Sequence, residues 1–253
     1  MIKNLTLFAL LPLLALVACN KDDNNNPGPK KVLDYIENGI SGDRTFYTFN
    51  DSGQLIRETE DDDVTTYTVN GNQLTISQFR NSENRVVAEI KYNLNADGNV
   101  ISGTGDFTYP GFAPFSAAYT VEYNSDGYMT QRTATQTDDE DWIYKYYWNN
   151  GDLTKMEWYN HDTLYLTIQN EYPKQFEDKL QIDFLKILKP TTDWTGKSTK
   201  HLVNHAFGIF APGTHITYSY SYLYHFDADG YVTSFIEHDD MGNVVDSTAY
   251  HYR

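Results

Sequence analysis

Two histidines four residues apart, His201 and His205, form the pattern in this sequence closest to a metal site. On a helix this spacing would place both imidazoles on one face, where they could share a zinc ion. The run lacks the glutamate of the His-Glu-x-x-His motif, and no third ligand can be assigned. We therefore expect no metal and no cofactor, and we interpret both histidines as exposed or capping residues. With Trp194, they stay the candidates for lining a ligand site.

Three acidic runs lie where hairpin loops are expected, at residues 61–63, 138–141 and 239–240. A glycosidase needs two facing carboxylates roughly 5 to 9.5 Å apart, and a sequence rich in loop acids cannot show such a pair. The sequence also has no Gly-x-Ser-x-Gly elbow, phosphate loop or dinucleotide fingerprint. We expect no catalytic residue. A secreted carbohydrate hydrolase using two loop carboxylates is the alternative.

The amino terminus has the anatomy of a secretory signal. A basic start is followed by an apolar run, Leu5 to Val17, and by small residues just before Cys19, the single cysteine. The run is too short to span a bilayer, which takes ~20 apolar residues. Its Leu-x-Ala-Cys ending resembles the lipobox of bacterial lipoproteins, which implies cleavage after residue 18 and a lipid on Cys19. An ordinary signal peptide with an unrelated cysteine is the alternative.

The residues after the cysteine define a tether. Lys21, Asp22 and Asp23 resemble the signal that sends Bacteroidota-type lipoproteins to the outer face of the outer membrane, although a plain polar spacer would look similar. Residues 19–31 hold nothing to bury, so we expect a disordered tether spanning roughly 20 Å. The resemblance implies an outer-membrane protein facing the cell exterior, with the periplasmic face as the alternative. The remaining residues, 32–253, are expected to form one domain.

The charge of the chain bears on its partners. A formal net charge of −16, with the basic residues scattered, argues against nucleic acid because repulsion from phosphate would dominate. The expected partners are the membrane, through the lipid, and a glycan or a neighbouring outer-membrane protein.

A repeated unit predicts the fold. Alternating aromatic residues run into Asn or Asp, then Gly, then apolar residues, as in "YNLNADGNVI" and "VEYNSDGYMT". Asn and Asp bond their own backbone and Gly supplies positive φ, so each unit indicates a β-hairpin. The expected turn glycines are Gly53, Gly71, Gly98, Gly127, Gly151, Gly230 and Gly242. We expect a mainly β protein, an antiparallel meander of sequential hairpins, in an open, split or closed sheet.

Alternation along the strands predicts one apolar and one wet face for each. Tyr144, Tyr146 and Trp148 point one way, as do the aromatic residues from Tyr218 to Phe226, and polar residues lie between them. The tryptophans could stack on sugar rings if they faced outward. Most of them share the apolar face, so core packing explains them better.

One stretch breaks the pattern. From Lys174 to Lys189, apolar residues recur every four positions and Pro190 follows, which indicates an amphipathic helix, with another strand pair as the alternative. A second short helix is expected over Thr199 to Phe207. We therefore expect one or two short helices inserted near residues 174–207, covering an end or a face of the sheet.

The tyrosine-rich turn units resemble the tyrosine/aspartate repeats of large bacterial shell-forming proteins. Together with the lipobox, the acidic export signal and the segment "NEYPKQFEDKLQIDFLKIL", they resemble an uncharacterised family of Bacteroidota surface lipoproteins, a domain of unknown function. The resemblance implies a β-rich lipoprotein with no established activity. We therefore expect a non-enzymatic binding or interaction module, while the enzyme question stays open.

Overall fold

The structure is a computed structural model that describes residues 31–51, 53–137, 141–174, 176–179, 196–211 and 218–253. The expected signal peptide, Cys19 and the export residues Lys21, Asp22 and Asp23 lie outside the described residues. Residues 31–253 form one compact unit. No helix among the described residues is long and apolar enough to cross a membrane.

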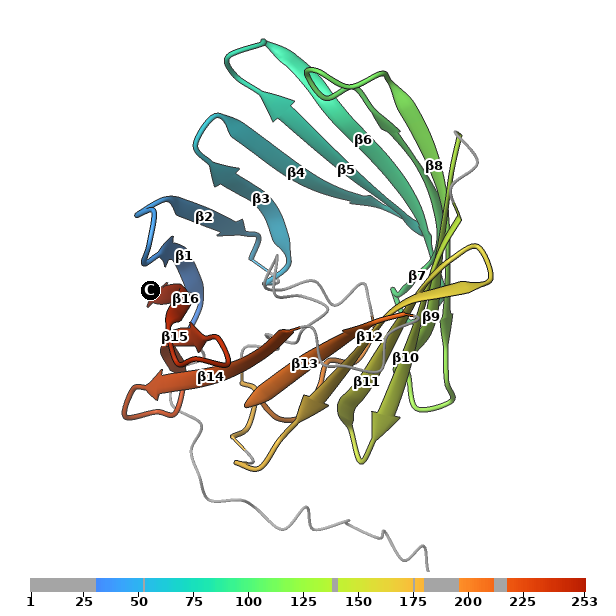
Figure 1. Cartoon of the computed structure of the whole chain (residues 1–253). Helices are drawn as coiled ribbons and strands as arrows, with labels where there is room; N and C mark the ends of the chain where they lie inside the picture. Colours follow the sequence, from blue (N-terminus) through green and yellow to red (C-terminus); the bar gives the residue numbers. More distant parts are fainter. Residues whose placement is uncertain (1–30, 52, 138–140, 175, 180–195, 212–217) are drawn as a thin grey trace, which may run out of the picture. The chain divides into compact units, whose positions relative to one another are not determined.

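The chain folds into sixteen antiparallel strands, each hydrogen-bonded to its neighbours in sequence, and the sheet closes into a barrel where β1 pairs with β16 (Figure 1). The strands are β1 (Leu33–Asn38), β2 (Arg44–Phe49), β3 (Leu55–Glu60), β4 (Asp63–Asn70), β5 (Gln73–Arg80), β6 (Arg85–Leu94), β7 (Val100–Phe107), β8 (Phe115–Tyr123), β9 (Met129–Gln136), β10 (Asp141–Asn149), β11 (Asp152–Asn160), β12 (Thr163–Glu171), β13 (His205–Phe210), β14 (Tyr218–Phe226), β15 (Val232–His238) and β16 (Val244–Tyr252). The predicted β-rich meander is confirmed, and the sheet is closed.

The turns use the chemistry expected from the repeated unit. In the β8–β9 connection, the side-chain Oδ1 of Asn124 accepts hydrogen bonds from the backbone N–H of Asp126 and Tyr128, and the N–H of Gly127 donates to the Asn124 carbonyl. Gly127 adopts φ +86°, a conformation that costs an L-residue roughly 1–2 kcal/mol. All the glycines predicted to mark turns have positive φ: Gly53, Gly71, Gly98, Gly127, Gly151, Gly230 and Gly242.

The barrel has two rims, because antiparallel neighbours place successive connections at alternate ends. The amino-terminal rim, as we name it, carries the start of β1, the end of β16 and the connections that follow even-numbered strands, including the long β12–β13 segment. The distal rim carries the connections that follow odd-numbered strands. Of the predicted turn glycines, Gly242 lies on the distal rim and the others lie on the amino-terminal rim.

The seam of the barrel is fastened at the amino-terminal rim. Val32 and Arg253 exchange backbone hydrogen bonds, and the Lys31 Nζ lies 2.7 Å from Asp227 Oδ2 and 2.8 Å from Asp229 Oδ2. Both aspartates belong to the β14–β15 turn. The first described residue is thereby held to this rim.

The hydrophobic core lies inside the barrel. One connected cluster takes buried side chains from β1 to β12, β15 and β16, and β14 adds the partly buried Tyr218, Tyr224 and Phe226. Tyrosines carry much of it, since Tyr47, Tyr67, Tyr146 and Tyr250 are each less than a tenth exposed. An aromatic side chain buries ~150–250 Å², so a few per hairpin supply a core that has few aliphatic residues.

Part of the outer wall of the barrel is polar, although apolar side chains such as Phe46, Val86 and Leu223 are also exposed on the strands. One row of directly paired, outward-facing residues crosses seven strands, from β2 to β8, without an apolar side chain. Its members are Thr48, Arg57, Thr66, Ser77, Glu89, Asp106 and Ser116. Each of them is exposed or half-buried, whereas the neighbours along their strands that face inward include Tyr47, Tyr67 and Ala88.

The structure differs from the predicted helices. The helix expected over Thr199 to Phe207 is wrong, because residues 199–204 are irregular with one β-bridge at His201 and residues 205–207 begin β13. Most of the helix expected over Lys174 to Lys189 lies outside the described residues, and its described residues, 174 and 176–179, are not helical. Within residues 196–204 the backbone N–H groups of Lys197 and Lys200 donate to neighbouring turns, and those of Leu202 and Asn204 donate to Phe176 and Glu171, which competes with helix formation.

Candidate functional site

The described parts of the β12–β13 segment, residues 172–174, 176–179 and 196–204, connect the rim to the core. Leu202 is 1 % exposed and belongs to the core cluster, and Phe176 packs against the same cluster. The two parts of the segment are joined by two hydrogen bonds, from the Leu202 N–H to the Phe176 carbonyl and from the Asp178 N–H to the Lys200 carbonyl. Burying Leu202 anchors an otherwise irregular segment, since a leucine side chain contributes ~1.5–3 kcal/mol on full burial.

Asp152, at the start of β11, fixes the same segment from the side. Its carboxylate accepts the backbone N–H of His201 at 2.9 Å and the hydroxyl of Thr199 at 3.3 Å, and its Oδ2 lies 2.9 Å from His201 Nδ1. The side chains of Asp152 and His201 are each 13 % exposed. His201 therefore positions the segment, and its ring is engaged by a carboxylate.

Residues 196–200 lie along two neighbouring turns of the rim. The N–H of Lys197 donates to the Gly127 carbonyl at 2.9 Å, and the N–H of Lys200 donates to the Gly151 carbonyl at 2.8 Å. Gly196 makes the close approach possible, because a Cβ there would lie 2.6 Å from the Gly127 carbonyl oxygen. The turn backbone and the segment therefore form one continuous surface.

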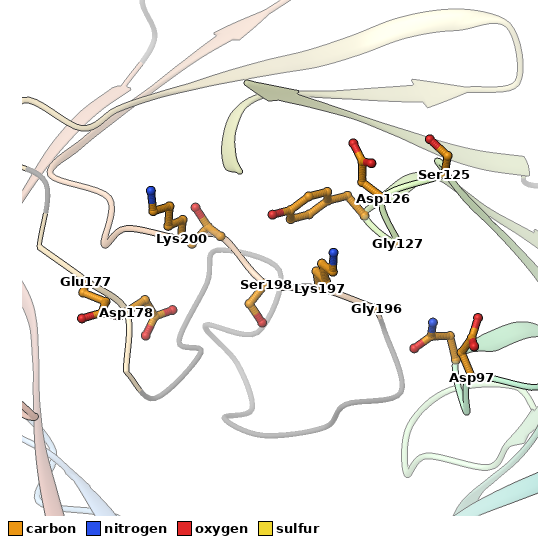
Figure 2. Close-up of a pocket in the computed structure, with 13 residues that line it drawn as sticks. Asp97, Ser125, Asp126, Gly127, Glu177, Asp178, Gly196, Lys197, Ser198 and Lys200 are labelled. Atoms are coloured by element: carbon orange, nitrogen blue, oxygen red, sulfur yellow. The ribbon is translucent and has the colours of Figure 1, made fainter. Parts of the chain in front are cut away.

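A groove of about 660 Å³ lies between the segment and the turns (Figure 2). Its walls come from the β6–β7 and β8–β9 turns on one side and from the two described parts of the β12–β13 segment on the other. The side chains that carry charge are Asp97, Asp126, Glu177, Asp178, Lys197 and Lys200. A second hollow of about 450 Å³ shares Asp126, Tyr128 and Lys197 with it and extends to the β10–β11 turn.

The groove combines opposite charges with an aromatic pair. Lys197 Nζ lies 5.5 Å from the ring centroid of Tyr128, which packs 4.7 Å from the ring of Trp148. The Trp148 indole N–H donates to the Met129 carbonyl at 2.6 Å, so this ring is fixed. Within the described part of the chain, neither Lys197 nor Lys200 has a carboxylate oxygen within 4.0 Å, although acids line the same groove. The arrangement suits a polar ligand that offers both acceptors and donors.

The residues predicted for a ligand site do not come together. His205 lies on the outer wall at the start of β13, where its Nδ1 is 3.7 Å from Glu171 Oε2 and both side chains are about half exposed. His201 lies at the amino-terminal rim against Asp152, and Trp194 is outside the described residues. The residues described here contain no cluster of three or more metal-ligating side chains.

The described acids of the three runs, Asp61 to Asp63, Asp141, Asp239 and Asp240, lie at the distal rim, away from His201, and residues 138–140 lie outside the described residues. Asp62 accepts the Ser82 N–H through both oxygens, and Asp63 pairs with Arg80 at 2.8 Å. Asp239 accepts two backbone N–H groups of its own turn, which together with a side-chain hydrogen bond from Asn243 holds its pKa below the usual range. These acids act in turns and ion pairs. The pattern that a hydrolase would need is not formed by the predicted residues.

Sequence reasoning missed the groove. Asp97, Asp126 and Tyr128 occupy equivalent turns, but the lysines that face them come from residue 197 onward, so no local spacing connects them. Gly196 to Lys200 is itself a short polar stretch, the one local feature of the groove that the sequence shows. Polar loops of that kind are where binding residues concentrate.

A comparison with protein-family models gives no match, and a comparison with curated proteins gives none. Solved structures do resemble the chain. A porin-like protein from Bacteroides uniformis matches with a TM-score of 0.66 and 17 % identity, over 89 % of this chain and 98 % of that one. A porin-like protein from Bacteroides vulgatus matches with a TM-score of 0.65 and 12 % identity, over 87 % and 98 %. At these identities the likeness shows the fold, a sixteen-stranded antiparallel barrel. The resemblance to a lipoprotein family stays a prediction.

Proposed function

We propose that this protein is an outer-membrane lipoprotein whose barrel stands in water outside the membrane and serves as a non-enzymatic binding module. The observation that carries the proposal is the polar row on the outer wall. A transmembrane barrel presents an apolar band ~25 Å tall to lipid and a polar lumen. Along this row, from β2 to β8, the barrel has the reverse arrangement, with charged and hydroxyl side chains outside and a tyrosine-rich core inside.

The free-energy cost of placing the polar row in lipid decides between a membrane-spanning pore and a water-exposed barrel. Seven strands ~4.8 Å apart, tilted by roughly 40°, would carry the polar row through about 18 Å of height, most of the hydrocarbon band. A lipid-facing arginine or lysine near the bilayer midplane costs ~2–4 kcal/mol, and acids add to this. The row includes Arg57, Glu89 and Asp106, so insertion would be strongly unfavourable.

The similar structures are described as porin-like, and a porin forms a pore. Besides an apolar outer band, a pore needs a water-filled lumen. The inward side chains of this chain form a connected apolar cluster that Leu202 of the β12–β13 segment joins. We therefore place the membrane attachment at Cys19, with Lys21, Asp22 and Asp23 directing export to the cell surface. The tether then reaches the barrel at Lys31, on the amino-terminal rim.

The binding role rests on the rim groove. Its lysines, Lys197 and Lys200, face a polar ligand or a loop of a neighbouring outer-membrane protein, and the contacts of Gly196 and Asp152 hold the wall of the groove in place. A hydrolase using loop carboxylates is disfavoured, because the described acids Asp62, Asp63 and Asp239 lie at the rim opposite His201 and are engaged in turns and an ion pair.

The test is fractionation of cells that produce the Cys19→Ala variant. We expect the variant to leave the membrane fraction and appear among soluble proteins, while the wild-type chain stays with the membrane. A barrel that spans the bilayer would remain in the membrane fraction after carbonate washing in both cases, and that result would refute the proposal. A second variant, Asp22→Ala with Asp23→Ala, keeps the lipid and should reduce cleavage by external protease; unchanged cleavage would contradict display at the surface.

A further inference from the structure

Inward-facing aromatic rings line the barrel at the distal rim. Trp142, Tyr165, Phe210 and Tyr218 follow one another across β10, β12, β13 and β14 in edge-to-face contacts, with ring centroids 5.8, 5.3 and 6.3 Å apart. Tyr165 is 45 % exposed and Phe210 is 36 % exposed. Solvent therefore reaches this end of the lumen, whereas the other end receives the buried Leu202.

Arg132 faces the lumen next to this aromatic chain. On β9 it pairs with Tyr144, while Ala134, two residues nearer the distal rim, pairs with Trp142. Its guanidinium carbon lies 5.3 Å from the ring centroid of Tyr119 and 5.8 Å from that of Tyr144. Burial raises the pKa of Tyr119 to about 12 against the opposing charge of Arg132, which places that charge beside the phenol. In the described part of the chain, Arg132 has no ion pair and no hydrogen-bond acceptor.

A second donor lies on the other side of the same tyrosine. Trp158 packs edge-to-face on Tyr144 with ring centroids 5.4 Å apart, and its indole N–H is buried without an acceptor among the described residues. A buried donor left unsatisfied costs ~1–3 kcal/mol, and a guanidinium carries five N–H groups. The lumen beside Tyr144 therefore has an excess of donors.

Glycines paired with tyrosines allow the tyrosine rings to lie flat against the barrel wall. Gly208 pairs directly with Tyr218, and a Cβ on Gly208 would overlap the Tyr218 ring, so the ring lies over the neighbouring backbone. Gly103 pairs with Tyr92 in the same way. A ring held flat on one strand presents its other face to the lumen, which is the geometry for stacking on a second flat, weakly polar surface.

We propose that the distal mouth of the barrel binds a neutral saccharide, with rings such as Tyr165 and Phe210 against its C–H faces and with Arg132 donating to its hydroxyl and ether oxygens. The proposal extends the proposed function, because a saccharide reaches this mouth only if the barrel stands in water. A saccharide matches both the exposed aromatic rings and the unpaired donors of the lumen, because its ring stacks on aromatic side chains and carries many acceptor oxygens.

Electrostatics selects a neutral saccharide over an acidic one. Arg132 contributes one positive charge, whereas the distal rim carries acids such as Asp61 and Asp240 together with the ion-paired arginines Arg80 and Arg85, and the chain as a whole carries −16. At physiological salt the Debye length is ~8 Å, so charges around the mouth still act on a ligand inside it. An anionic sugar would be attracted by Arg132 and repelled by the acids of the rim.

The test is titration of the chain from residue 19, carrying Cys19→Ala, with maltohexaose, cellohexaose, mannohexaose and xylohexaose, followed by intrinsic tryptophan fluorescence and calorimetry. We expect at least one of these neutral hexasaccharides to bind at one site and to change the fluorescence. Tyr165→Ala, at an exposed position, and Arg132→Gln should each weaken that binding tenfold or more. Lys197→Gln, in the groove at the other rim, should leave it unchanged.

The outcomes separate this inference from the proposed function. Absence of binding to all four sugars, or binding that Tyr165→Ala leaves unchanged, would overturn the saccharide site. Tighter binding of a galacturonate hexamer than of any neutral sugar would overturn the ligand class. Because Arg132→Gln could disturb the fold, Arg132→Lys serves as a second variant; unaltered melting with weaker sugar binding is the expected result, and unaltered binding would contradict the role of Arg132. The membrane fractionation of Cys19→Ala does not depend on any of these results.

Discussion

Replacing Gly196 by alanine tests how the β12–β13 segment is held on the rim. Gly196 has φ +81°, which costs an L-residue roughly 1–2 kcal/mol. The new Cβ would lie 2.6 Å from the Gly127 carbonyl oxygen and 2.6 Å from Tyr123 Cε1. Separating the two backbones would also break the hydrogen bond from Lys197 to Gly127, worth ~0.5–1.5 kcal/mol. We expect a total loss of about 1.5–3.5 kcal/mol in the free energy of unfolding.

Gly127→Ala is the matched control for that experiment. Gly127 has a similar φ of +86°, but a Cβ there would meet only the Lys197 side chain at 3.8 Å or beyond. It should therefore lose the conformational part alone, ~1–2 kcal/mol. Urea unfolding of both variants measures the difference, and trypsin cleavage near Lys197 and Lys200 reports whether the segment has detached. Equal stability and equal cleavage in the two variants would refute the close contact of Gly196 with the turn.

Three further changes test other parts of the account. Leu202→Ala should lower the free energy of unfolding by ~2–5 kcal/mol, because it empties a buried position in the core; a loss below 1 kcal/mol in urea unfolding would place Leu202 outside the core. Burial and the nearby Asp246 raise the pKa of Glu237, so the folded state binds its proton more tightly and stability falls as pH rises above about 4.5. Glu237→Gln should therefore raise the melting temperature at pH 7 and leave it nearly unchanged near pH 3, and an equal shift at both values would contradict this. Asp227→Asn removes the carboxylate that Lys31 bonds at 2.7 Å, and amide exchange should become faster in β1 than in β8; uniform exchange would argue against the fastened seam.

The hairpins could be predicted from the sequence because their turns are made by neighbours in the chain. Asn124 and Gly127 are three residues apart, and the hydrogen bonds of their turn lie within five residues. The spacing of the turn glycines, two strands and two turns, also follows from the alternation of the rims. Closure is different, because it depends on β1 pairing with β16 from the opposite end of the chain. Strand number, stagger and tilt must fit together for a barrel to close, and no local pattern encodes that fit.

The β12–β13 segment shows why the site was harder to predict than the fold. The apolar repeat from Phe176 onward predicted a helix, but Phe176 and Leu202 pack in the core, and the backbone N–H groups of Lys197 and Lys200 donate to neighbouring turns. His201 looked like half of a helical histidine pair. Its partner is Asp152, 49 residues away in sequence, so its positioning role is a product of tertiary structure.

The central claim is that the polar row on the outer wall keeps this barrel out of the bilayer. Flotation of the Cys19→Ala chain with phosphatidylcholine vesicles, in buffer without detergent, tests it most directly. We predict that the protein stays dissolved and folded and remains at the bottom of the gradient with and without vesicles. Recovery of the folded protein with the floating vesicles, or a requirement for detergent to keep it in solution, would contradict the account.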